Sequence, residues 1–292
     1  MFLALLTLVL WRFHQDPAKQ LEYKATRVDL VGRMQLALTA ASEAEKSAVL
    51  AITDQESQRF ADQARAASAE VGREHQDLAR LLAAGGTQRE RDLLAQFSEA
   101  FGTLQRIDEE VLRLAAKNTN LKAYALLFGP AADALVEADA ALARVAAKFA
   151  DSPNAKDVVL LASTARIGML RVQTLLAPHI AEESDPRMDQ LEASMSKEEM
   201  QVREGLAGLA RVPGLGKDAD LTAAASTFVR YGELKTRILA LSRENTNIRS
   251  LSLSLGQRRN AMVLCVEPLD ALKQAILEEP IAGVSYGRVP TR

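Results

Sequence analysis

Cysteine, aromatic residues, glycine and proline are all scarce in this chain of 292 residues. The single cysteine, Cys265, has no partner for a disulfide within the chain, and no cysteine cluster exists that would bind zinc or an iron–sulfur cluster. With 15 glycines and 9 prolines, the sequence offers few places for turns, which favours long elements of secondary structure.

An excess of charge of either sign is also missing. The chain has 36 Lys and Arg against 38 Asp and Glu, a formal net charge of -2, so it lacks the basic surface that a nucleic-acid partner would require. Hydrophobic residues make up 48% of the chain but aromatic residues only 4%, so its apolar content is mainly Ala, Leu and Val. Such residues suit the seams between packed helices.

The patterns that mark common active sites and cofactor sites are absent as well. The three histidines, His14, His75 and His179, fall in different segments, and none belongs to an H-E-x-x-H zinc pattern. The chain has no C-x-x-C-H haem attachment, no paired E-x-x-H for a di-metal bundle and no G-x-S-x-G elbow. We therefore expect no enzyme activity, no catalytic residue, no metal site and no cofactor.

A helical period runs through almost the whole sequence from Asp16 onward. Gly129-Pro130 looks like the end of one helix and the start of the next, and residues 151–154 look like a linker. Pro178 and Pro268 predict kinks or helix ends. The breaks together predict eight helices, at 16–52, 54–84, 87–128, 130–150, 156–182, 186–211, 217–255 and 257–279.

One segment of the sequence recurs at an offset of 127 residues. Asn118-Thr119-Asn120 returns as Asn245-Thr246-Asn247, and Leu, Phe, Gly and Ala positions on both sides stay in register without a gap. A unit of this length holds four helices, so the repeat predicts an all-α chain of two tandem antiparallel four-helix bundles. The predicted domains are a first bundle at 16–152, a second at 153–280, and an irregular tail at 281–292.

The repeated asparagines sit in otherwise apolar seams. Stepping by four and three residues along each predicted helix gives an apolar row that only Asn118 or Asn245 interrupts near its middle. An unpartnered buried amide costs a few kcal/mol, so each should have a specific partner. These residues either fix the helix register or contact a ligand, and replacing either by leucine should leave the fold intact or stabilise it.

Two further polar residues interrupt apolar seams and are candidate ligand contacts. Glu45 falls among apolar positions of the first predicted helix, and His179 ends the apolar row of the fifth. A buried His179 could respond to pH. The alternative for His179 is a helix-end residue that reaches water.

Residues 1–11 are apolar, yet a spanning helix needs about 20 such residues. With Trp11, Arg12 and Phe13 as an interfacial collar, we interpret residues 1–15 as the remnant of a membrane anchor. The alternative is an amphipathic docking segment.

Two stretches carry a resemblance to a known family. Residues 114–134, LAAKNTNLKAYALLFGPAADA, and residues 242–256, SRENTNIRSLSLSLG, resemble the junction of the third and fourth helices in the four-helix-bundle sensor domain of bacterial methyl-accepting chemotaxis receptors. The resemblance implies an extracytoplasmic bundle, tethered to the inner membrane by an N-terminal helix, that recognises a small solute or a periplasmic binding protein and often forms a homodimer. A bimodular sensor of six helices, two of them very long, is an alternative arrangement.

These observations predict a sensor-type helical bundle of a chemoreceptor-like signalling protein, located in the periplasm and held at the inner membrane. The alternative is a structural or scaffold bundle that binds other proteins and has no small-molecule ligand.

Overall fold

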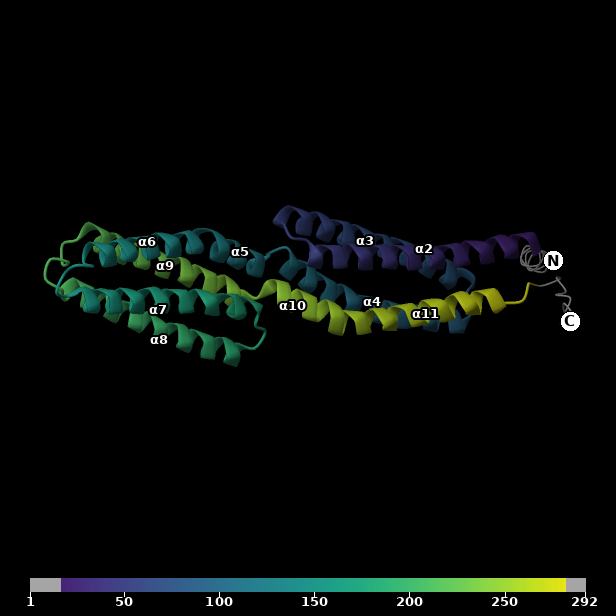
Figure 1. The fold of residues 1–292 in the computed structure, drawn as a ribbon. Helices are drawn as coiled ribbons and strands as arrows, with labels where there is room; N and C mark the ends of the chain where they lie inside the picture. Colours follow the sequence, from purple (N-terminus) through teal and green to yellow (C-terminus); the bar gives the residue numbers. More distant parts are fainter. Residues whose placement is uncertain (1–16, 282–292) are drawn as a thin grey trace, which may run out of the picture. The chain divides into compact units, whose positions relative to one another are not determined.

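The computed structural model describes residues 17–281, and 89% of these residues are helical (Figure 1). This confirms the prediction of an all-α protein, and no strand occurs in the part of the chain that is described. The proposed anchor at 1–15 lies outside the described residues, as does the predicted tail beyond Ile281.

The helices fall into two hairpins and two long, interrupted helical stretches. The first hairpin is α2 (Pro17–Leu50) and α3 (Asp54–Gly85), and the second is α7 (Ala155–Ala181) and α8 (Asp185–Arg211). The first long stretch contains α4 (Gln88–Ala115), α5 (Thr119–Leu126), the π-helix η1 (Leu127–Ala131) and α6 (Ala132–Lys148). The second contains α9 (Ala219–Glu244), α10 (Thr246–Leu253), the π-helix η2 (Ser254–Arg258) and α11 (Arg259–Glu278).

The chain divides into two compact units whose bounds differ from the two predicted bundles. Unit 1 contains residues 1–116 and 251–292, and unit 2 contains residues 117–250. Within unit 1, α2, α3, α4 and α11 surround one core, and within unit 2, α5 and α6 pack with α7, α8 and α9. The predicted boundary near residues 151–153 is instead a turn inside unit 2.

The repeat explains this exchange of helices. In the predicted first bundle, the fourth helix was residues 130–150, which is α6. In the structure its place in unit 1 is taken by α11, its counterpart in the repeat. The chain therefore has six helical stretches, two of them long, as in the bimodular alternative, and not eight separate helices.

The exchange follows from the way the chain passes Gly129-Pro130 and Gly256. Both were predicted to end a helix, and both instead lie within a five-residue π-helical turn from which the next helix continues. The wider π turn omits a regular i→i−4 hydrogen bond, so it accommodates the missing N–H of Pro130 without reversing the chain. The two π turns lie 127 residues apart, as the repeat requires.

The prolines at 178 and 268 likewise fall within helices and do not end them at once. α7 continues to Ala181 and α11 continues to Glu278. The second hairpin packs closely because of its glycines: a Cβ on Gly168 of α7 would meet Val202 of α8 at 2.7 Å, and one on Gly205 of α8 would meet the Leu161 carbonyl at 2.9 Å.

Among the described residues, α7 has the length and apolar composition that a membrane-spanning helix would need, with a mean hydropathy of 1.3. It nevertheless packs within unit 2, where a third of its most apolar window, 33%, is buried. α7 is therefore apolar on its core face and on much of its outer face.

Unit 1 is built from two separate stretches of chain, and a buried ion-pair clamp joins them. Arg27 of α2 is 2% exposed, and its Nη1 donates to both carboxylate oxygens of Glu90 in α4 at 2.8 and 3.0 Å. Arg27 also binds Glu279, and Lys24 donates to the carbonyls of Leu277 and Glu279 at 2.7 Å each. The clamp thus fixes the end of α11 against the start of α2.

We predict that Arg27→Met destabilises the protein by about 3–5 kcal/mol, because it leaves the fully buried Glu90 without its guanidinium partner. Urea unfolding followed by circular dichroism measures the loss. Arg73→Met is the matched control, since Arg73 is exposed, pairs only along its own helix, and should change stability by less than about 1 kcal/mol. Equal effects from the two variants would contradict the proposed role of the clamp.

Candidate functional site

The repeated Asn-Thr-Asn motif marks the place where each long helical stretch breaks. Asn118 and Asn245 both have left-handed backbones, with φ of 50° and 53°, and they are 2% and 1% exposed. Their predicted burial is confirmed. The predicted continuous helix through each is wrong, because a non-glycine residue in this conformation ends one helix and starts the next, and asparagine is among the residues that tolerate it best.

The two breaks cap each other across unit 2. The first N–H groups of a helix have no partner within it. In α5, the N–H of Thr119 donates to Thr246 Oγ1 at 3.2 Å, and the N–H of Asn120 donates to Asn247 Oδ1 at 3.1 Å. In α10 the same bonds run in the opposite direction, from Thr246 to Thr119 and from Asn247 to Asn120, at 3.1 Å each. Each break therefore supplies the other with its N-caps.

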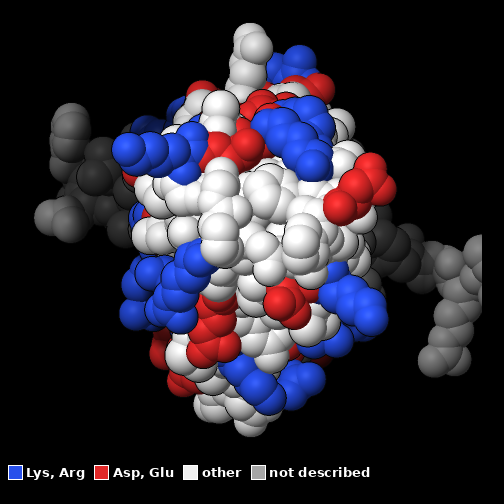
Figure 2. All heavy atoms as spheres, turned by 60° about the vertical axis from the view of Figure 1, so that its left-hand side comes forward, with Lys and Arg blue, Asp and Glu red and all other residues white. Residues whose placement is uncertain are grey.

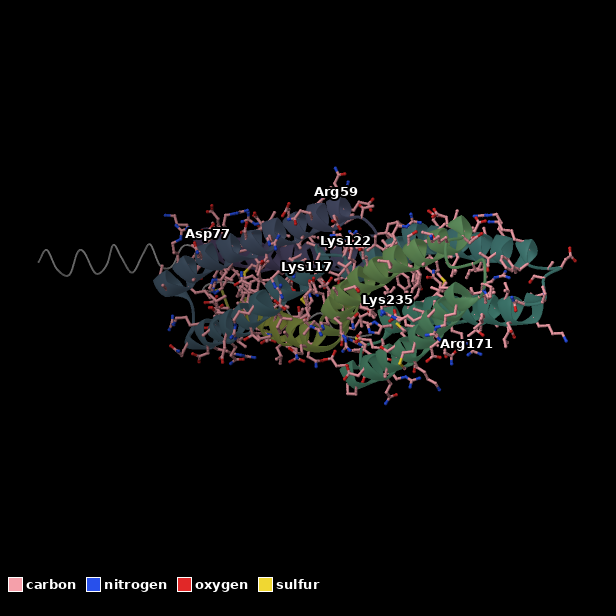
Figure 3. All side chains as sticks on the ribbon, turned by 90° about the vertical axis from the view of Figure 1, so that its left-hand side faces the viewer. Arg59, Asp77, Lys117, Lys122, Arg171 and Lys235 are labelled. Atoms are coloured by element: carbon pink, nitrogen blue, oxygen red, sulfur yellow. The ribbon has the colours of Figure 1, made fainter. Side chains whose placement is uncertain are left out.

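Side-chain amides and one ion pair complete this reciprocal joint. Asn120 Nδ2 donates to Asn245 Oδ1 at 2.7 Å, and the equivalent bond runs from Asn247 Nδ2 to Asn118 Oδ1 at 2.9 Å. Outside the joint, Lys117 pairs with Glu244 at 3.1 Å. Lys122, labelled with Lys117 in Figure 3, donates to the Lys117 carbonyl at 2.8 Å. Residues separated by 127 positions thus face each other and do not occupy matching places in two separate bundles.

The joint also caps the C-terminal end of α7. The last carbonyls of a helix have no partner within it. Here the carbonyl of Ile180 accepts from Asn120 Nδ2 at 2.7 Å, and that of Glu182 accepts from Asn245 Nδ2 at 2.7 Å. The carbonyl of His179 accepts from the Ser242 hydroxyl at 2.9 Å. The second hairpin is thereby tied to both long stretches at one level.

His179 extends this polar network and is fully buried, which excludes the helix-end residue that reaches water. Ser242 uses its proton on the His179 carbonyl, so His179 Nδ1, 2.8 Å away, must donate to the hydroxyl. Nε2 lies 2.9 Å from Glu192, which Arg243 also binds. Burial alone would raise the pKa of Glu192, but hydrogen bonds from Arg243 and His179 outweigh it and hold this pKa below its ordinary value. An ionised Glu192 requires a proton on Nε2, so the geometry fits an imidazolium.

Glu45 lies in unit 1, apart from this network. It is fully buried in α2 beside Arg258 of η2, whose Nε is 3.1 Å from it and 2.5 Å from Asp108 of α4. Arg258 Nη1 donates to Ser42 at 3.1 Å. Neither Glu45 oxygen has a well-formed hydrogen bond, so one guanidinium faces two buried carboxylates.

This charge imbalance favours a proton on Glu45. Burial raises the pKa of Glu45 above its ordinary value, and the nearby Arg258 only partly opposes that effect. Burial also raises the pKa of Asp108, again against Arg258, but Asp108 receives the short bond from Nε. Protonation of Glu45 leaves a balanced Asp108–Arg258 pair in the core.

The arginines nearest the helix interfaces all have carboxylate partners within the chain. Arg33 lies near Glu74 at 3.5 Å, Arg166 binds Asp139 and Arg171 binds Glu198. In residues 17–281 no group of three or more His, Cys, Asp or Glu residues is placed to hold a metal ion. Shallow hollows lie on the helix surfaces, including one of about 400 Å³ beside Arg27 and one of about 400 Å³ beside Arg166.

Of the residues predicted from the sequence, the structure brings Asn118, Asn245 and His179 into one network and places Glu45 elsewhere. Sequence reasoning missed the partners that satisfy them. Thr119 and Asn120, with their counterparts 127 residues on, were visible as identical residues of the repeat, and that identity was a signal that they do related work. Arg258 and Ser242 carried no such signal, because neither interrupts an apolar row in the sequence.

Comparison of the chain with known protein families finds no match, and comparison with curated proteins finds none either.

We predict that Asn118→Leu destabilises the protein by about 2–4 kcal/mol, since leucine disfavours the left-handed backbone and loses the bond from Asn247. This reverses the prediction made from the sequence alone. Asn118→Gly keeps the backbone and should cost only about 1 kcal/mol. Asn260→Leu, on an exposed face of α11, is the control. Urea unfolding ranks the three, and equal stabilities for the leucine and glycine variants would refute the strain argument.

We predict that Glu45→Gln raises stability at pH 7–8 by about 1–3 kcal/mol, and that this gain disappears toward pH 4. The folded-state pKa of Glu45 is raised, so its contribution to stability is fully present below the unfolded pKa and is lost as pH rises through the folded pKa. Urea unfolding across pH 4–8 measures the difference. Glu43→Gln, the exposed neighbour on α2, should show no such trend, and a pH-independent effect of Glu45→Gln would contradict the argument.

Proposed function

We propose that this chain is the sensor-type helical region of a chemoreceptor-like signalling protein, in the bimodular rather than the tandem arrangement. It is extracytoplasmic, is held at the inner membrane through residues 1–15, and binds a small solute or a periplasmic partner protein. The resemblance of residues 114–134 and 242–256 to chemoreceptor sensor junctions supports this proposal, together with the six-stretch, two-unit architecture.

The reciprocal Asn-Thr-Asn joint is the observation that carries the proposal. Its bonds link two helical stretches in a single register, and sliding either helix by one residue would break all of them together. Helix displacements of ~1–2 Å are a known means of transmitting a signal. A joint that holds or fails as a unit gives such a displacement two discrete states, which a sensor requires.

The joint would act on position and not as the binding pocket itself. Its amide donors already have protein partners, and the hollows in the described part of the chain lie on helix surfaces. Asn118, Asn245 and His179 are therefore proposed as positioning residues of the signalling path. The same closed packing favours the alternative, a scaffold bundle that has no small-molecule ligand.

A thermal-shift screen distinguishes the sensor from the scaffold. A solute that binds only the folded protein at 100 times its Kd stabilises it by about 2.7 kcal/mol, so a true ligand should give a saturable rise in melting temperature. The library should contain carboxylates, amino acids, amines and purines. Asn118→Gly should retain binding if the joint transmits the signal and does not contact the solute. A complete screen without any saturable shift would favour the scaffold.

Location can be tested with the single native cysteine. Cys265 is fully buried, and burial raises its pKa to about 12, so it should not react with maleimides in the folded protein. Thr222→Cys places a thiol on an exposed part of α9. A membrane-impermeant maleimide should label this variant in intact spheroplasts and leave the parent chain unlabelled. Labelling that requires lysis would contradict an extracytoplasmic location.

A further inference from the structure

The outer face formed by α6 and α7 in unit 2 is apolar, unlike an ordinary solvated helix surface. On α7 the outward positions Leu160, Ile167 and Leu170 are 66%, 49% and 53% exposed, and they follow the four-and-three spacing of a helix-packing seam. This exposed row explains why α7 has the hydropathy of a membrane span although one face is already in the core. Figure 2 looks toward the α6–α9 end of unit 2 and shows uncharged side chains gathered across the middle of the view.

The neighbouring row on α6 has the same spacing but small side chains. Val136 is 68% exposed, and Ala140, Ala143 and Ala147 continue the exposed row. Hollows of about 400 and 550 Å³ lie between the two rows and share Ser163 as a lining residue, so the groove is continuous. The α6/α7 face therefore has a ridge of large apolar side chains beside a trough lined by alanines.

Charged groups that border this face are turned toward other helices of the unit. On the α6 side, Arg144 pairs with Asp220 of α9 at 2.7 Å. On the α7 side, Arg171, labelled in Figure 3, pairs with Glu198 of α8 at 3.4 Å. Across the groove, Arg166 and Asp139 neutralise each other through two bonds of 2.5 and 3.0 Å. The face thus offers neutral, apolar surface over most of its length.

We propose that a second copy of this chain covers the α6/α7 face, with the two copies related by a two-fold axis parallel to the helices. An isologous interface must match itself, and here the ridge and the trough supply the two complementary halves. Leu160 lines the same hollow as Ala146 and Ala150, and Ile167 lines the same hollow as Val136 and Asp139. Rotation about the axis keeps these levels, so α7 of one copy meets α6 of the other, with Leu160 over Ala147 and Ile167 over Ala140.

The size of the face sets the strength of the pairing. From Lys156 to Leu170 the seam is about 22 Å long, and two helices side by side are about 20 Å wide. Each copy would bury on the order of 450 Å², or about 900 Å² for the pair, which lies at the low end for specific interfaces. The dimer should therefore form in the micromolar range, and it should be favoured where the chain is concentrated.

Sedimentation velocity on the full chain from about 1 to 200 μM tests the proposal. We expect a concentration-dependent dimer, and Ile167→Glu should weaken it at least about tenfold because it places a charge in the seam. Val229→Glu is the control, since Val229 is equally exposed, at 62%, but lies on α9. A chain that stays monomeric at 200 μM, or a dimer that Ile167→Glu leaves unchanged, would overturn the proposal.

A complementary exchange tests the two-fold packing itself. Ala140→Leu should weaken the dimer without lowering the melting temperature of the monomer, because Ala140 is exposed in a single copy. Ile167→Ala should also weaken it. The double variant should recover most of the parent affinity, since each new leucine would face a new alanine on the partner. Two weakening single variants without recovery in the double would overturn this arrangement of the copies.

Discussion

The left-handed asparagines are the constraint on which the rest of the structure depends. A helix that must break inside a packed protein leaves N–H groups unpaired on one side and carbonyls on the other. Here two breaks lie side by side within unit 2, and each supplies the caps that the other lacks. Neither break would be tolerable alone, because its buried N–H groups would each cost about 1–3 kcal/mol without a partner.

This pairing also accounts for the way the units exchange helices. Because the chain continues through both π turns, the last helix of each repeat packs in the unit opposite to the one that a simple duplication would give. The Arg27 clamp then holds unit 1 together from its two separate stretches. The joint and the clamp are both buried polar devices that specify one arrangement among several that the apolar pattern would allow.

The helical class, the repeat and the burial of Asn118 and Asn245 could all be predicted, because apolar periodicity and an exact recurrence are properties of the sequence itself. The connectivity could not. Gly129-Pro130 is a strong signal for a helix end, and only the packing around the π turn shows that the helix continues. Glu45 was identified as a polar residue in an apolar row, but its partner Arg258 is more than 200 residues away and follows no local pattern.

The division of unit 1 between two stretches has a consequence for synthesis of the protein. Helices α2, α3 and α4 leave the ribosome first, with core residues such as Phe97 and Leu104 prepared for a partner that does not yet exist. That partner, α11, follows only after all of unit 2, which at 5–20 residues per second is a wait on the order of ten seconds. Unit 2, made from one uninterrupted stretch, is complete sooner. The part of the protein that is translated first is thus the last to finish folding, and its apolar faces need protection from aggregation in the interval.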